Sequence, residues 1–216
     1  MKNTFLNIVC GSIFLFAVTT AKAEMNFGVS LMAGTLDTSG HELENANTSD
    51  KNSRSFTEDF VGGSLFIENT FSNGIVVGVD YIPVDIEVGS GSRTDSAVAA
   101  ASGGAENDTG TRTSSADLTD LVTLYANIPL EDTDFYLLGG VHMLTVSPSA
   151  TLPNSKYSDE DLYGYQIGFG KKIDNYKVEF FYSDFEDIEL SPTGGGNNNK
   201  IEADADAFGL KLAYVF

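Results

Sequence analysis

The chain has 216 residues, with 31 acidic and 12 basic side chains, one cysteine and a formal net charge of −19. This charge argues against nucleic acid as a partner, because phosphates attract basic surfaces. A single cysteine excludes a disulfide within the chain and a cysteine-ligated metal centre.

Residues 1–23 predict a cleaved secretory signal peptide. Lys2 provides a positive start, an apolar run follows from 5 to 18, and Ala21-Lys22-Ala23 is a small-x-small cleavage pattern. The alternative is a transmembrane helix, but the run is short and interrupted for a bilayer span. Cleavage removes Cys10 and two lysines, which changes the formal net charge from −19 to −21. Residues 24–216 then form a single expected domain.

Apolar side chains alternate with small or polar ones throughout this domain. A period of two residues predicts β-strands, since successive side chains point to opposite faces. Eight segments show the pattern: 27–33, 61–71, 75–81, 122–128, 135–143, 163–169, 176–182 and 208–216.

The connections between these segments alternate in length. Short ones occupy 72–74, 129–134 and 174–175, and long, low-complexity ones occupy 35–59, 89–117, 147–161 and 187–205. This alternation predicts an all-β fold, an eight-stranded antiparallel up-and-down transmembrane β-barrel. Pro83 predicts a bulge, after which Val84, Ile86 and Val88 continue the outer apolar face.

A soluble β-sandwich would alternate in the same way, so the second face decides between the two folds. That face is rich in glycine and poor in charge, which suits a crowded barrel interior better than a solvated exterior. Aromatic residues also gather at the segment ends, as in the two aromatic girdles of membrane barrels.

The last strand carries apolar residues at alternate positions and ends in an aromatic one: Phe208, Leu210, Leu212, Tyr214 and Phe216. It resembles the assembly signal of Gram-negative outer-membrane barrels, and 124–143 resembles the central hairpin of eight-stranded opacity-type, OmpA-like and OmpX-like surface proteins. The resemblance implies an integral outer-membrane location with extracellular loops. It also implies partners: the barrel assembly machinery, periplasmic chaperones, outer-membrane lipid and lipopolysaccharide.

The sequence predicts no enzyme, cofactor or metal site. Some eight-stranded barrels modify lipid A with a histidine and a serine two residues later, but no serine stands there after His142, which is expected inside the barrel. Acidic clusters in 35–59 and 147–161 suit Ca²⁺, yet none has the spacing of a calcium loop. A narrow channel for small apolar solutes needs an apolar lumen, and the inward charges argue against one.

Five charged residues fall on the inward parity at similar distances from the short turns: Glu68, Asp80, Lys177, Glu179 and Lys211. Because buried charges persist when they are paired, these residues are expected to form a layer that plugs the lumen. The expected function is a structural or adhesive role at the cell surface through long acidic loops. The alternative is a narrow channel for small, possibly hydrophobic, solutes.

Overall fold

A computed structural model describes residues 24–43, 51–95, 110–151, 156–194 and 199–216. The predicted signal peptide lies outside these residues. The described chain is all β-structure, and no helix in it is long and apolar enough to cross a membrane.

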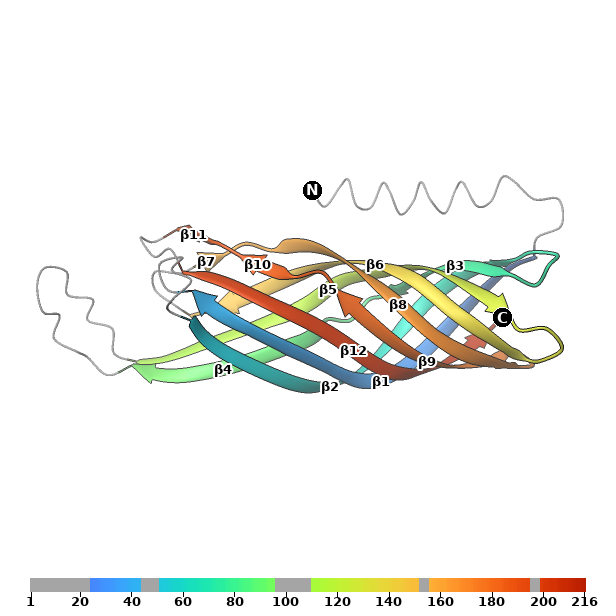
Figure 1. Ribbon diagram of the computed structural model, residues 1–216, viewed down its shortest axis with the longest axis horizontal. Coiled ribbons are helices and arrows are strands. Elements are labelled where there is room, and N and C mark those ends of the chain that lie inside the picture. The colour runs from blue at the N-terminus through green and yellow to red at the C-terminus, as the bar shows by residue number, and fades with distance from the viewer. Residues whose placement is uncertain (1–23, 44–50, 96–109, 152–155, 195–198) are drawn as a thin grey trace, which may run out of the picture.

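The strands form one antiparallel barrel with an elongated shape (Figure 1). Their bounds are β1 Glu24–Leu43, β2 Lys51–Thr70, β3 Val76–Ile82, β4 Ile86–Asp95, β5 Gly110–Pro129, β6 Phe135–Ala150, β8 Glu160–Ile173, β9 Tyr176–Phe185, β10 Ile188–Leu190 and β12 Lys200–Val215. β7 Lys156–Tyr157 and β11 Pro192–Gly194 pair as a separate small sheet.

Eight strands make up the wall, as the alternation predicts. Two of them are interrupted: β3 continues as β4, and β9 continues as β10. β12 pairs with β1 from Gly28–Val215 to Leu43–Lys200 and closes the ring. Short turns join the strands at the end of the molecule where the chain terminates.

The wall has two zones, which differ in the side chains that face outward. In the proximal zone, next to the short turns, the exterior is apolar: Leu31 is 66 % exposed and Val61 80 %. In the distal zone, beginning at about Thr35 on β1 and above Val61 on β2, the exterior is polar. Outward-facing apolar side chains around a barrel are suited to contact with lipid. We therefore call the proximal exterior the membrane belt.

The interior changes in the opposite sense. Proximal inward positions hold glycines, hydroxyls and charges beside a small apolar cluster of Phe66, Ala213 and Val215, whereas distal inward positions hold a large core of apolar residues. Leu144 and Leu36 in this core are 0 % and 1 % exposed. The alternation therefore continues from one zone to the next with its polarity reversed.

The reversal corrects two expectations. Much of the four predicted long loops is strand: β1 extends to Leu43, β4 and β5 pair from Ile86–Leu118 to Asp95–Gly110, and β6 extends to Ala150. Ile86 and Val88 are buried in the core and not on the outer face. The polar residues of these segments are outward-facing strand residues in the part of the barrel beyond the membrane belt. Their composition resembles that of loops.

Candidate functional site in the barrel interior

The structure places all five predicted lumen charges inside the proximal zone, and each is buried. Lys177 of β9 contacts Glu68 of β2 as an ion pair. Lys211 Nζ of β12 lies 3.1 Å from Asp80 Oδ2 of β3 and 2.9 Å from Glu179 Oε2 of β9. These five residues, here called the charge layer, join four strands of the wall.

Two tyrosines that the sequence did not single out complete this layer. Tyr125 Oη donates to Glu68 Oε2 at 2.7 Å, and Tyr136 Oη donates to Glu179 Oε1 at 2.7 Å. Three carboxylates face only two lysines, and the hydroxyl donors help to stabilise the excess negative charge. The inward parity of both tyrosines on β5 and β6 was a signal that could have identified them.

Each tyrosine ring fits into the space left by a glycine. A Cβ at Gly78 would lie 2.4 Å from Cζ of Tyr125, and one at Gly170 would lie 2.4 Å from Cζ of Tyr136. Any larger residue at either position would displace the ring. Glycines on the inward face thus allow the two rings to fill the lumen beside the charges.

A second polar layer, centred on His142 of β6, lies on the distal side of the charges. Its Nδ1 is 2.8 Å from Thr123 Oγ1, and its Nε2 is 2.9 Å from Ser183 Oγ. Gln166 Nε2 donates to the same serine oxygen at 3.3 Å. Both ring nitrogens have partners, so the geometry is that of a hydrogen-bonded interior histidine.

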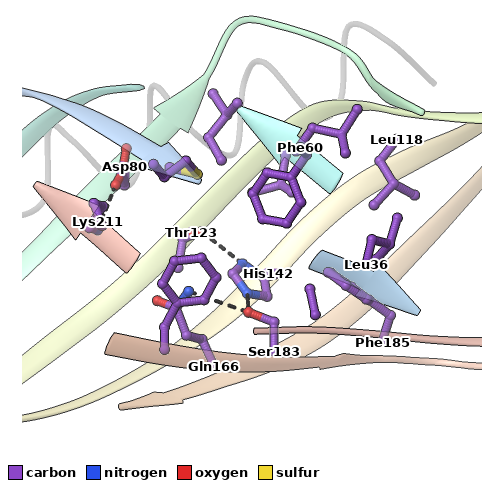
Figure 2. A pocket seen from close by; sticks show the side chains of 16 residues that line it. Leu36, Phe60, Asp80, Leu118, Thr123, His142, Gln166, Ser183, Phe185 and Lys211 are labelled. Atoms are coloured by element: carbon purple, nitrogen blue, oxygen red, sulfur yellow. Dashed lines mark hydrogen bonds and ion pairs between the residues drawn. The ribbon is translucent and has the colours of Figure 1, made fainter. Parts of the chain in front are cut away.

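A cavity of about 40 Å³ lies where the polar layers meet the apolar core (Figure 2). Its polar lining consists of Asp80, Thr123, His142, Gln166, Ser183 and Lys211. Its apolar lining includes Met32, Leu36, Phe60, Ile82, Leu118 and Phe185. By volume it has room for a few water molecules or for roughly three or four heavy atoms of a ligand.

The wall beside this cavity has an interruption in its hydrogen bonding. β3 pairs with Leu65–Thr70 of β2, but β4 pairs with β5 alone, so no described strand pairs with the outer edge of β2 from Lys51 to Ser64. The change begins at Pro83, which has no N–H to donate. We call this unpaired boundary between β2 and β4 the seam.

Side chains fill the seam. The Phe56 ring packs against Gly89, where an added Cβ would lie 3.0 Å from Cγ, and Thr38 Oγ1 donates to the Val88 carbonyl at 3.4 Å. Val84, beside Pro83, is exposed on the outside. Phe60 of β2 and Ile86 of β4, which line the cavity, belong to the two sides of the seam.

The outer surface of the distal zone is acidic. Asp206 of β12 pairs across the sheet with Asp37 of β1 on one side and Asp184 of β9 on the other. Burial and the neighbouring carboxylates of Asp37 and Asp184 raise the pKa of Asp206 above its usual value. Among the residues that the structure describes, no group of three or more acids, histidines or cysteines is arranged to hold a metal ion.

No protein-family model matches the sequence, and no curated protein matches it. The fold does resemble solved structures. The outer membrane protein OprG of Pseudomonas aeruginosa superposes with a TM-score of 0.51 at 12 % identity, over 88 % of this chain and 95 % of OprG. The outer membrane protein AlkL superposes with a TM-score of 0.52 at 15 % identity, over 92 % of this chain and 94 % of AlkL.

At these identities the likeness shows the fold, an eight-stranded barrel of the type found in outer membranes of Gram-negative bacteria. The belt of exposed apolar side chains is what such a barrel presents to lipid. The fold and this belt are those of an integral outer-membrane barrel. In such barrels the short turns face the periplasm and the longer connections face outward.

Proposed function

We propose that this barrel passes small apolar molecules from the outside into the outer membrane through the seam. One observation carries the proposal: a cavity with a largely apolar lining lies directly behind the place where the wall lacks strand pairing. A narrow channel was only the alternative expectation from the sequence, because the inward charges argued against an apolar lumen. The charges occupy only the proximal zone, and the distal interior is apolar.

The charge layer determines the direction of the proposed path. An apolar molecule gains free energy by leaving water for the distal interior, at about 25 cal/mol per Å² of buried apolar surface. It gains nothing by crossing a layer of paired charges, which it would have to desolvate or separate. The seam begins at the distal edge of the membrane belt, where Val61 and Val84 are exposed, so a sideways step there delivers the molecule to lipid.

The path is closed in this structure, because Phe56 and Phe60 fill the space beside the seam. A solute larger than the cavity of about 40 Å³ needs these rings and the flexible Met32 to change rotamers. Transport therefore requires that the edges of β2 and β4 move relative to each other.

A disulfide across the seam tests this requirement. A Cβ at Gly62 would lie 3.6 Å from Cγ2 of Val84, so Gly62→Cys with Val84→Cys is a suitable pair. The mature domain contains no other cysteine, which keeps the pairing unique. Uptake of naphthalene by cells that produce the protein should fall toward the level of cells without it, and a reductant should restore it.

The matched control is a second disulfide away from the seam. Ser30 and Ser64 are cross-strand partners whose hydroxyl oxygens are 2.7 Å apart, so Ser30→Cys with Ser64→Cys links β1 and β2 without touching β4. This variant should take up naphthalene like the wild type. Equal uptake with the seam oxidised or reduced would refute the sideways path.

The acidic exterior of the distal zone favours a second candidate, a structural or adhesive role at the cell surface. Its support is the row of aspartates on β1, β12 and β9, held on paired strands that project beyond the membrane belt. Binding of the purified barrel to host surfaces, matrix proteins and other bacterial cells would test it. An Asp184→Asn, Asp206→Asn variant should bind less, and unchanged binding would remove the acidic row from this role.

A further inference from the structure

The polar side of the cavity has an acceptor that no described residue uses. Asp80 is 4 % exposed, and its Oδ2 accepts from Lys211 at 3.1 Å. Its Oδ1 is buried and accepts no hydrogen bond from the part of the chain that the structure describes. A buried carboxylate oxygen without a donor is costly, so this atom favours a ligand that supplies one.

The remaining polar groups of the cavity are already engaged with each other. His142 bonds Thr123 and Ser183, and Gln166 donates to Ser183. Lys211 is shared between Asp80 and Glu179. A ligand in the cavity therefore contacts one unused acceptor on the polar side. On the other side it contacts apolar side chains, among them Leu36, Leu118 and Phe185 (Figure 2).

We propose that the cavity is a binding site for small neutral molecules with an apolar body and one hydroxyl donor, such as short alcohols, and that the hydroxyl donates to Asp80. An anion would be repelled by Asp80 itself, and a cation would have to leave water for a cavity whose lining is mostly apolar. A pure hydrocarbon would leave the acceptor unpaired. The inference rests on the proposed function, for which it names the favoured class of solute.

Two isomeric probes separate the hydroxyl donor from apolar bulk. 1-Propanol and ethyl methyl ether have the same atoms and fit a cavity with room for about four heavy atoms, but only the alcohol donates a hydrogen bond. The barrel is reconstituted in lipid nanodiscs, and binding is followed by NMR through the methyl signals of Leu36, Leu118 and Ile82. 1-Propanol is expected to bind at least tenfold more tightly than ethyl methyl ether.

Asp80→Asn should reduce the preference for the alcohol to less than threefold, because a neutral amide oxygen is a weaker acceptor than a carboxylate. Lys211 keeps Glu179 as a counter-ion in this variant, and the backbone NMR spectrum reports whether the barrel is folded. If the variant does not fold, Ser183→Ala provides a second test, since it leaves Asp80 intact and should keep the alcohol preference. Asp85→Asn, an exposed acid outside the cavity, is the matched control and should behave like the wild type.

Equal binding of the two isomers to the wild type would overturn the inference, as would a cavity that takes up only water and neither probe. An unchanged preference in Asp80→Asn would overturn the role of Asp80. None of these results depends on naphthalene uptake or on the seam disulfide, so failure of this inference is distinguishable from failure of the sideways path.

Discussion

Lys211 is the residue on which most of the charge layer depends, because its ammonium group contacts two buried carboxylates. Lys177 has one carboxylate partner and also lies 5.6 Å from the centre of the Phe66 ring. Removing a cation from such a group costs more than the pair itself contributes, since charges remain buried without compensation.

We therefore expect Lys211→Met to lower the free energy of unfolding by about 3 kcal/mol, the cost of stranding a buried charge. Urea unfolding in detergent micelles, followed by electrophoretic mobility without boiling, measures the change. Lys172→Met, at an exposed site near the end of β8, is the control and should be close to neutral. A Lys211→Met barrel as stable as the wild type would show that lumen water hydrates these charges separately.

The sequence predicted which charged residues face inward, because parity within a strand fixes the side on which each side chain lies. It could not predict that Lys211 joins Asp80 and Glu179 while Lys177 takes Glu68. Those partners depend on the stagger between strands around the closed barrel, which only the complete ring determines. The unused oxygen of Asp80 was hidden for the same reason.

At the scale of the strand, eight wall strands and their short turns were predictable and their lengths were not. On β1 the apolar side chains change from the outward positions Leu31 and Ala33 to the inward position Leu36. The alternation of inward and outward positions along the strand does not change. A prediction of strand length from outward-facing apolar residues alone therefore ends each strand too early, at this reversal. The seam could not be predicted either. Pro83 indicates an irregular strand, but the sequence does not show that the pairing with β2, and not that with β5, ends there.

The acidic row on β1, β12 and β9 predicts a pH dependence for the distal strands. Burial and the carboxylates of Asp37 and Asp184 raise the pKa of Asp206, so the folded state binds a proton more readily than the unfolded state. The stabilising contribution is complete below the ordinary pKa of an aspartate, about 3.9, and is lost as pH rises through the raised value.

Amide hydrogen exchange measures this effect locally. Protection factors for β1 and β12 near Asp37 should increase as the pH is lowered from 7 toward 4. Asp206→Asn should increase them at pH 7 and flatten the pH profile. Asp134→Asn, in a short turn at the opposite end, is the control. Protection that falls on acidification in the same way in both variants would contradict the predicted sign.

β12 also carries the predicted assembly signal, which the folded structure does not test. Phe216 is 71 % exposed on the outside, and its N–H donates to the Phe27 carbonyl at 2.8 Å. Deleting Phe216 should reduce the amount of barrel inserted in the outer membrane of cells, measured by membrane fractionation. Protein refolded in detergent should keep nearly wild-type stability in urea. Normal insertion in cells would contradict a signalling role.

For the whole molecule, buried charges and tyrosines occupy the proximal interior, and the distal zone is a projecting barrel with its own apolar core. We expect the charge layer, Tyr125 and Tyr136 to block the passage of hydrated ions along the axis. The wild-type barrel should therefore show no steady conductance in planar lipid bilayers at neutral pH. A stable open channel with reproducible unit conductance would contradict the closure.

The two-zone barrel is the central claim, and the depth of outward positions on β1 tests it most directly. Single nitroxide labels at Leu31, Ala33, Asp37 and Ser39 share one outward parity on this strand. In bilayers, we expect the first two labels to be relaxed by oxygen and shielded from a water-soluble nickel chelate, and the last two to show the reverse. A label at Ser39 that reports lipid, or one at Leu31 that reports water, would contradict the account.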